Sequence, residues 1–341
     1  MKLLITGGAG YIGTHTCVEL LNQGHQVIVI DNLSNSTTEA LKKVTEITKT
    51  EEVPLYQGDI RDRALLQKIF KTHKIDAVMH FAGLKAVAES MQKPLQYYNN
   101  NVAGSIILLE EMQQAGIKTI IFSSSATVYG NPETLPITET HPIGGTTNPY
   151  GQSKLIIEVI LKDLHKTDSS WKIALLRYFN PVGAHPSGKI GENPNGIPSN
   201  LIPYISQVAA GKLKKLKIYG NDYTTQDGTG VRDYIHVVDL AKGHIAALNK
   251  LTTDNCTLIT VNLGTGQGVS VLQMVKAFEQ VTGKKIPYEI VARRDGDIAE
   301  CWTSTEYAEQ YLGWKAQNNL QQMCSDTWRY QQNISYPTPR T

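Results

Sequence analysis

The sequence predicts an α/β fold in which a doubly wound parallel sheet is followed by a smaller C-terminal α/β domain. Three observations predict it. Short apolar runs alternate with helical patterns in the first half of the chain, a glycine-rich turn follows the first run, and the alternation stops after Tyr178. Such alternation is typical of parallel sheets with helices on both faces. The 341 residues accommodate two domains, since domains average about 150 residues.

Each element has its own local signal. Short apolar runs bounded by glycine or polar residues predict buried strands, and apolar residues at helical spacing predict the helices between them. We expect strands at residues 2–6, 27–30, 53–57, 76–81, 118–122 and 172–178. We expect helices at residues 11–22, 62–71, 94–114 and 150–165.

A loop-rich segment separates the two predicted domains. Residues 181–200 contain four prolines and four glycines, a composition that favours loops. We therefore predict a dinucleotide-binding domain at residues 1–180, to which the chain returns around residues 235–263, and a substrate domain at residues 181–341.

Composition and charge exclude several classes of protein. With 33 basic and 31 acidic side chains, the net charge is +2. This lacks the large basic excess of a nucleic-acid-binding protein. No apolar run approaches the roughly 18 residues of a membrane span. The four cysteines have no paired spacing, so neither a disulfide framework nor a metal site is indicated, and we expect a cytoplasmic protein.

The glycine-rich turn indicates a dinucleotide site. Gly7, Gly10 and Gly13 are spaced three apart between the first strand and the first helix. Such a turn lets a pyrophosphate approach bare backbone at the positive end of a helix, as in a Rossmann-type domain. Asp31 ends the second strand, where a carboxylate binds the adenosine ribose and repels a 2′-phosphate, which favours NAD over NADP. The alternative for Asp31 is a helix cap.

The ends of the third and fourth strands carry further candidates. Asp59 follows the third strand and residues 81–83 follow the fourth. Ligands of doubly wound sheets bind outside the carboxyl ends of the strands, so we expect Asp59 to meet the adenine edge. The alternative is that Asp59 caps the helix that begins near Asp62.

A tyrosine and a lysine form the candidate catalytic pair. Tyr150 and Lys154 lie four residues apart on a predicted helix and so share one face. An ammonium beside a phenol lowers the phenol pKa, and the cationic nicotinamide ring of bound NAD acts in the same direction. Tyr150 is therefore a candidate base near neutral pH. Ser125, at the end of the fifth strand, is a candidate member of the same hydrogen-bond network.

These motifs resemble the extended short-chain dehydrogenase/reductase family, and within it the UDP-hexose 4-epimerases. The resemblance extends from Met1 to near Trp328, which is nearly the whole chain. It is carried by the glycine turn at residues 6–13, the serine-rich strand end at 123–130, and the segments at 80–87, 150–154, 177–186 and 230–236.

The resemblance implies two sets of binding residues. The residues expected to bind NAD are Gly7, Gly10, Tyr11, Ile12, Gly13, Asp31, Asn32, Asn35, Ser36, Asp59, Ile60, Phe81, Ala82, Gly83, Lys85, Asn100, Ser123, Tyr150, Lys154 and Tyr178. The residues expected to bind the UDP-hexose are Lys85, Ser125, Tyr150, Phe179, Asn180, Asn200, Leu201, Tyr219, Arg232, Tyr234, Arg294, Asp297 and Cys301. Guanidinium groups suit phosphate oxygens, which agrees with the two arginines.

Three of these residues have a structural alternative. Arg232 could pair with Asp233 or another surface acid, Lys85 could be a solvated lysine, and Asn100 could cap a helix.

The implied activity is inversion of C4 of the hexose through a 4-keto sugar, with Tyr150, Lys154 and Ser125 as the catalytic residues. The hydride passes to NAD and returns, so the cofactor stays bound. Related 4,6-dehydratases have Asp-Glu directly after the strand-end Ser or Thr, whereas this chain has Ala126 and Thr127, so dehydration is not expected. An NAD-dependent sugar-nucleotide dehydrogenase and a non-catalytic NAD-binding regulator remain as alternatives.

Two finer expectations come from the resemblance. Cys301 aligns where members restricted to glucose and galactose have tyrosine, and a small residue leaves room for an acetamido group, which implies activity on UDP-GlcNAc and UDP-GalNAc. The alternative is a buried cysteine without influence on specificity. The helices at 94–114 and 150–165 imply a homodimer, although the same apolar stripes could serve an intramolecular core.

Overall fold

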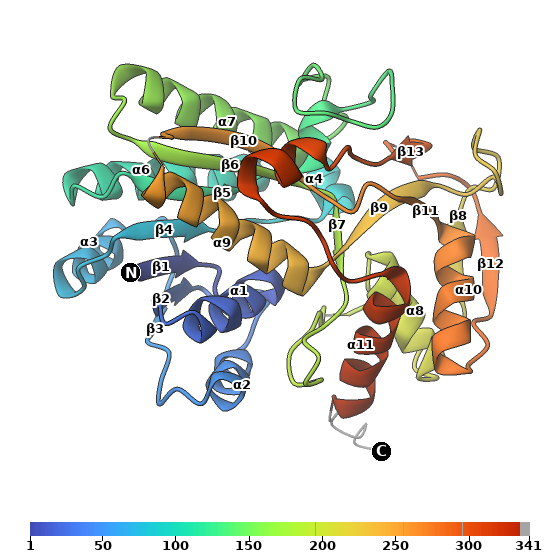
Figure 1. Cartoon of the computed structure of the whole chain (residues 1–341). Coiled ribbons are helices and arrows are strands. Elements are labelled where there is room, and N and C mark those ends of the chain that lie inside the picture. The colour runs from blue at the N-terminus through green and yellow to red at the C-terminus, as the bar shows by residue number, and fades with distance from the viewer. Residues whose placement is uncertain (195, 255, 295, 335–341) are drawn as a thin grey trace.

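The computed structural model describes residues 1–194, 196–254, 256–294 and 296–334. At its centre is a sheet of seven parallel strands in the order β10-β6-β5-β4-β1-β2-β3 (Figure 1). The strands are β1 (Lys2–Thr6), β2 (Gln26–Asp31), β3 (Leu55–Gln57), β4 (Ala77–His80), β5 (Thr119–Ser123), β6 (Lys172–Tyr178) and β10 (Leu258–Leu263). The order reverses direction between β1 and β4, the position where doubly wound sheets bind ligands.

Helices cover both faces of this sheet. One face carries α1 (Tyr11–Asn22), α2 (Thr38–Thr48) and α9 (Val237–Thr253), and the other carries α3 (Arg63–Thr72), α6 (Gly104–Gln114) and α7 (Pro149–Thr167). Within β1, Leu3 and Ile5 pack toward the first set and Leu4 toward the second, because successive strand residues point to opposite faces. The predicted doubly wound sheet is thereby confirmed.

Some element boundaries differ from the expectation. The predicted helix 94–114 consists of α5 (Pro94–Tyr97), a π-helical turn (Tyr98–Ala103) and α6. The sequence analysis missed α2 and α4 (Val87–Gln92). In α2 only Leu41 and Val44 are buried, so its apolar pattern is too sparse to stand out.

The C-terminal part contains smaller sheets. Strand β9 (Val231–His236) pairs with β7 (Asn180–Val182), β11 (Gly268–Ser270) and β13 (Glu300–Cys301), and β8 (Leu216–Tyr219) pairs in parallel with β12 (Tyr288–Val291). These pack with α8 (Leu201–Ala209), α10 (Val271–Thr282) and α11 (Leu320–Asn333), and a π-helical turn lies at Ala308–Leu312. After β9 the chain returns through α9 to place β10 beside β6 (Figure 1). The domain boundaries themselves stay a prediction.

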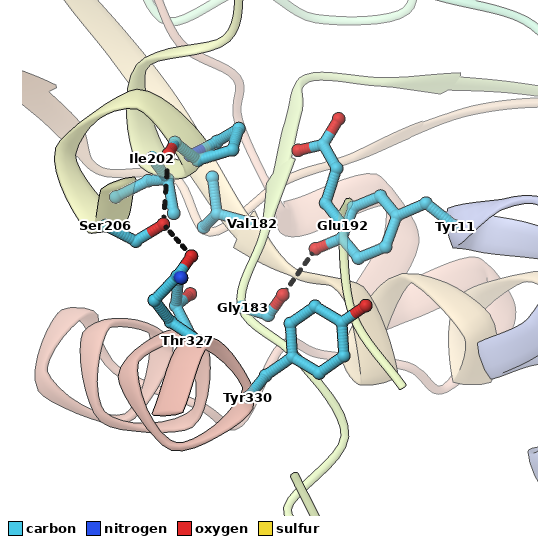
Figure 2. A pocket seen from close by; sticks show the side chains of 10 residues that line it. Tyr11, Val182, Gly183, Glu192, Ile202, Ser206, Thr327 and Tyr330 are labelled. Atoms are coloured by element: carbon cyan, nitrogen blue, oxygen red, sulfur yellow. Dashed lines mark hydrogen bonds between the residues drawn. The ribbon is translucent and has the colours of Figure 1, made fainter. Parts of the chain in front are cut away.

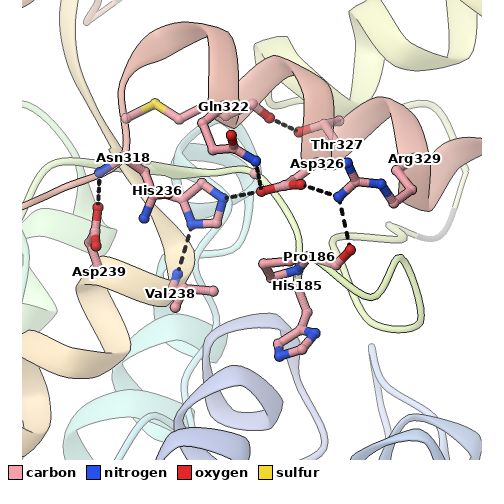
Figure 3. A network of polar contacts seen from close by, with 12 residues as sticks. His185, Pro186, His236, Val238, Asp239, Asn318, Gln322, Asp326, Thr327 and Arg329 are labelled. Carbon is pink, nitrogen blue, oxygen red and sulfur yellow. Dashed lines mark hydrogen bonds and ion pairs between the residues drawn. The ribbon is translucent and has the colours of Figure 1, made fainter. Parts of the chain in front are cut away.

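A polar network connects α11 to the start of α9. The Nε2 atom of His236 lies 3.3 Å from Oδ2 of Asp326, and Nδ1 of the same ring accepts the backbone N–H of Val238 (3.1 Å; Figure 3). Arg329 donates both to Asp326 and to the carbonyl oxygen of Pro186. The last helix is therefore tied to the loop that follows β7. No helix of the described residues has the length and apolarity to cross a membrane.

Candidate active site

The glycine turn between β1 and α1 is shaped by close backbone contacts. Gly7 has φ +69°, and a Cβ there would lie 2.8 Å from the backbone nitrogen of Ala82. A Cβ on Gly13 would lie 2.3 Å from the carbonyl oxygen of Gly7, so helix and turn pack together only without side chains. Gly10 precedes α1, and no side chain caps the helix N-terminus. Free N–H groups and bare backbone at a helix start fit a pyrophosphate such as that of NAD.

Asp31 lies against this turn. Its Oδ2 accepts the N–H of Ala9 (3.0 Å), and its Oδ1 accepts the N–H of Leu33 (2.9 Å) and the hydroxyl of Ser36 (2.8 Å). The N-terminus of α2 is instead at Thr37, so the alternative that Asp31 is a helix cap is wrong. A fixed carboxylate at the end of β2 fits a ribose hydroxyl.

Asp59 is held by its neighbours. The Arg61 guanidinium donates to both of its oxygens (2.8 Å each), and Asn32 donates to Oδ2 (3.0 Å). These hydrogen bonds from Arg61 hold the pKa of Asp59 at about 2. The helix cap is Asp62, which accepts the N–H of Leu65, so the capping alternative for Asp59 is wrong.

Tyr150 and Lys154 lie on α7, which begins at Pro149 with Asn148 as its cap. Both side chains are buried, with 8% and 5% of their surface exposed. The Lys154 ammonium donates to the carbonyl oxygen of Ser123 at the end of β5 (2.7 Å) and lies 4.9 Å from the Phe122 ring centroid. Burial lowers the pKa of Lys154 to about 8.

Burial opposes the lowering of the Tyr150 pKa that the sequence analysis expects. Burial raises its pKa above the usual value, and the Ser125 hydroxyl and the positive charge of Lys85 offset only part of that effect. The charge that lowers the pKa of Tyr150 is thus Lys85, whereas the sequence analysis expected Lys154. Desolvation of a fully buried phenol outweighs the neighbouring charge, and spacing along a helix does not reveal burial.

Three consecutive serines begin at Ser123, the last residue of β5, and each has a different partner. Ser123 donates its hydroxyl to Tyr178 Oη (2.8 Å), Ser124 donates to Glu158 Oε1 (2.6 Å), and the Ser125 oxygen accepts from the N–H and the hydroxyl of Thr127 (3.2 and 2.9 Å). Ser125 is the cap of the short 3₁₀ turn that follows. The strand end is therefore fixed on both sides of the candidate catalytic serine.

The sequence analysis missed the buried ion pair beneath this strand end. Glu158 and Arg177 are 0% and 2% exposed and form two hydrogen bonds, Nε to Oε1 (2.9 Å) and Nη2 to Oε2 (2.6 Å). Arg177 also donates to Tyr129 Oη (3.0 Å). Glu158 follows Lys154 by four residues on the same face of α7, which was the signal available in the sequence.

Asn101 was also missed. Its side chain accepts the N–H of Leu84 (2.8 Å) and donates to the Leu84 carbonyl and to Ser153 Oγ (3.0 and 2.9 Å), which ties the loop after β4 to α7. The neighbouring Asn100 lies within the π-helical turn and donates to Asn101 Oδ1, so the capping alternative for Asn100 is wrong.

Lys85 is paired across the site. Its Nζ lies 2.8 Å from Oε1 of Glu192, and the same oxygen accepts from the Asn200 amide (2.8 Å). Lys85 comes from the loop after β4, whereas Glu192 and Asn200 come from the segment that leads to α8. Glu192 and Tyr11 line the same small pocket, in which Tyr11 donates to the Gly183 carbonyl (2.7 Å; Figure 2). About half of the Lys85 side chain is exposed (51%), so the alternative of a solvated lysine stays open beside the ion pair, and Glu192 was not predicted.

A second group of predicted residues lies in the C-terminal part. Arg232 donates to the carbonyl oxygens of Val231 and Ala299 (2.8 and 3.4 Å). Asp233 is fully buried and accepts instead from Thr265 and Gly266, so the predicted alternative of an Arg232–Asp233 pair is wrong. Neighbouring residues of a strand point to opposite faces, which separates the two side chains.

Arg294 completes this group. Its guanidinium lies 4.6 Å from the Tyr219 ring centroid and donates to Asp297 Oδ2 (2.9 Å). Tyr234 is buried, and the charges of Arg232 and Arg294 both act on its hydroxyl. The structure thus brings two guanidinium groups and two tyrosines together, which suits an anionic ligand such as a diphosphate.

Cys301 links the two groups. Strand β13 places it opposite Arg232 on β9, and its side chain packs against the apolar cluster that contains Ala126 and Phe179. Because Ala126 follows Ser125 directly, Cys301 lies near the candidate catalytic end of β5. Burial raises the pKa of its thiol to about 11, so the side chain stays neutral.

The remaining predicted site residues lie in or next to the elements of the sheet and of the C-terminal part. Ile12 is in α1, Asn35 is in the loop after β2, Ile60 follows Asp59, Phe81 to Gly83 follow β4, and Asn180 and Leu201 begin β7 and α8. Among the described residues no group of three or more His, Cys, Asp or Glu is arranged to hold a metal ion, and all four cysteines are free.

Comparisons with known proteins agree with this geometry. The GDP-mannose 4,6 dehydratase family model matches residues 4–327. A UDP-glucose 4-epimerase of Bacillus subtilis (strain 168) is 59% identical over 331 residues, which cover 97% of each chain.

Two solved structures are close to this one in fold and sequence. UDP-glucose 4-epimerase from Bifidobacterium longum, in complex with NAD⁺ and UDP, has a TM-score of 0.95 at 55% identity over 97% of this chain and 98% of that one. UDP-glucose 4-epimerase from Stenotrophomonas maltophila, with bound NAD and formylated UDP-arabinopyranose, has a TM-score of 0.94 at 53% identity over the same shares. The chain therefore belongs to the UDP-glucose 4-epimerases, within the wider NAD-dependent epimerase/dehydratase family.

Proposed function

We propose that this protein interconverts UDP-galactose and UDP-glucose by oxidising and re-reducing C4 of the hexose, with NAD as a tightly bound cofactor. One observation carries the proposal. The buried Tyr150 and Lys154 on α7 lie beside the end of β5. That strand belongs to the sheet whose β1–α1 turn fits a dinucleotide. Cys301 lies between this strand end and the group of Arg232 and Arg294. The NAD-bound relatives described above support the choice of cofactor.

Tyr150 removes the proton from the 4-hydroxyl of the sugar, and Ser125 holds that hydroxyl. NAD would be held by the glycine turn and Asp31, and when bound it would supply the reversible acceptor for the hydride of C4. The positive charge of Lys85 acts on the Tyr150 phenol, and Lys154 is fixed by its hydrogen bond to the Ser123 carbonyl oxygen. Arg232 and Arg294 hold the diphosphate, so the 4-keto hexose turns about its bond to the phosphate while the nucleotide stays in place. Returning the proton from Tyr150 completes the inversion.

Dehydration does not fit these residues, although the matching family model is named for a dehydratase. Elimination of water needs an acid and a base next to the sugar. The positions after Ser125 are Ala126 and Thr127, and neither side chain titrates near neutral pH.

The finer substrate range rests on Cys301. Its side chain packs against the cluster with Ala126 and Phe179 and is smaller than the tyrosine of restricted members, which supports activity on UDP-GlcNAc and UDP-GalNAc. The test is Cys301→Tyr. The ratio of UDP-GlcNAc to UDP-galactose turnover should fall at least tenfold, and an equal loss on both sugars would contradict this part.

A homodimer is part of the proposal. α5 and the π-helical turn pack against α7, and this side of the molecule exposes Leu95 (82%) and Val159 (47%). Exposed large apolar side chains often mark a protein interface. Val159→Lys should shift the sedimentation coefficient to that of a monomer, whereas Ile290→Lys, an equally exposed control on β12, should leave it unchanged.

The experiment that tests the function is incubation of the purified protein with UDP-galactose and no added cofactor. An epimerase forms UDP-glucose with many turnovers. Stoichiometric NADH absorbance without UDP-glucose would instead indicate a net dehydrogenase, and the absence of both would indicate a regulator that binds the nucleotide.

A further inference from the structure

Tyr223 is a buried phenol without a hydrogen-bond partner. Only 7% of its surface is exposed, and its Oη finds no donor or acceptor within the described part of the chain. Buried hydroxyl groups are nearly always paired, because leaving one unpaired costs about 1–3 kcal/mol. An unpaired buried hydroxyl in a fixed loop therefore suggests that a bound ligand supplies its hydrogen-bond partner.

The loop around Tyr223 is rigid. The N–H of Tyr223 donates to the Gly228 carbonyl (3.0 Å), and the Tyr223 carbonyl accepts the N–H of Thr225 (2.8 Å). Gly228 has φ +77°, and a Cβ there would lie 2.1 Å from the Asn221 carbonyl oxygen, so the turn closes tightly. The phenol is thus held in place before any ligand binds.

The surroundings of the phenol are strongly charged. The Arg293 guanidinium lies 4.1 Å from the Tyr223 ring centroid and is itself paired with Asp222 (2.7 Å). The charges of Asp297, Arg232 and Arg294 also act on the phenol. Arg232 and Arg294 are the residues to which the proposed function assigns the diphosphate.

The phenol is a donor at neutral pH. Burial and the charge of Asp297 raise the pKa of Tyr223 above its usual value, while the three arginines offset part of the effect. A protonated phenol beside guanidinium groups adds an O–H donor for a bound anion. Hydrogen bonds to a charged acceptor are stronger than those between neutral groups.

We propose that Tyr223 is a nucleotide-binding residue whose hydroxyl donates a hydrogen bond to an oxygen of the diphosphate of the UDP-sugar. This inference rests on the proposed function, since it assumes that Arg232 and Arg294 receive a diphosphate. It adds a residue that the motifs did not indicate, because nothing in the local sequence reveals an unpaired buried hydroxyl.

The test is Tyr223→Phe, which removes only the hydroxyl. The probe is UDP, its Kd is measured by titration calorimetry on the NAD-loaded protein, and the melting midpoint is measured without UDP. The matched control is Tyr288→Phe, since Tyr288 is exposed on β12 of the same part of the chain. We expect the Kd of Tyr223→Phe to rise about tenfold, as the loss of one hydrogen bond to a charged group predicts.

The melting midpoint gives the second readout. Because the variant no longer buries an unpaired hydroxyl, its midpoint without UDP should equal or exceed that of the unsubstituted protein. A Kd within twofold of the unsubstituted protein would overturn the inference, and so would a higher Kd accompanied by a lower midpoint, since that indicates a structural role. If the unsubstituted protein itself binds no UDP, the proposed function fails as well, which separates the two cases.

Discussion

Replacing one partner of the Glu158–Arg177 pair should destabilise the protein more than replacing both. Both side chains are almost fully buried, so each single replacement leaves a charge without its partner in the interior. Breaking a buried pair in this way costs about 3–5 kcal/mol, whereas apolar replacement of both partners is close to neutral.

The contacts that each single variant leaves in place decide which of the two loses more stability. Arg177→Met leaves the Glu158 carboxylate with Lys162 at 3.6 Å and with the Ser124 hydroxyl. Glu158→Leu leaves the Arg177 guanidinium with only the hydroxyl and ring of Tyr129 among its described contacts. We therefore expect a loss of about 3 kcal/mol for Arg177→Met, about 5 kcal/mol for Glu158→Leu, and about 2 kcal/mol for the double variant, which loses the contacts of Glu158 with Ser124 and Lys162 and of Arg177 with Tyr129.

Urea denaturation of the four proteins at pH 7, followed by tryptophan fluorescence, gives the free energies of unfolding. The double variant should be more stable than either single variant. Losses that simply add in the double variant would refute the argument, because they would show that the two charges do not depend on each other. Tyr150, Lys154 and Glu158 share a face of α7, so turnover should fall in each folded variant while UDP affinity stays within twofold.

The remaining predictions concern the catalytic pair. Tyr150→Phe should lower kcat by about 10²–10⁴, the usual contribution of a general base, with the Kd of UDP within twofold by calorimetry; a variant that keeps a tenth of the activity would remove Tyr150 from this role. Lys154→Met should change how stability depends on pH. Burial lowers the pKa of Lys154 from 10.5 to about 8, so between these pH values the unfolded chain binds a proton that the folded protein lacks, and stability rises with pH. The difference in unfolding free energy between the unsubstituted protein and Lys154→Met should grow by about 3 kcal/mol from pH 7 to pH 10.5 in urea titrations, and a constant difference would show that Lys154 has an ordinary pKa.

Local patterns allowed much of the fold and part of the site to be predicted. The glycine turn and the strand ends depend on residues close together in sequence, so spacing alone located Gly7, Gly13 and Asp31 correctly relative to β1 and β2. The helical segment 94–114 was expected as one helix, and its π-helical turn has no signal in composition.

Contacts between segments distant in the sequence could not be predicted from local patterns. Lys85 meets Glu192 across 107 residues of sequence, and Asn101 reaches Ser153 because the π-helical turn packs on α7. The effect of burial on the Tyr150 pKa was missed for the same reason, since burial is decided by the tertiary structure.

The central claim is that a hydrogen leaves C4 of the sugar and returns to the same carbon. UDP-galactose labelled with tritium at C4 tests it most directly, in ordinary water with no added NAD. The account predicts that UDP-glucose retains the label at C4 over many turnovers. Loss of the label to water would contradict the account, because it would mean that C4 exchanges its hydrogen with solvent during inversion.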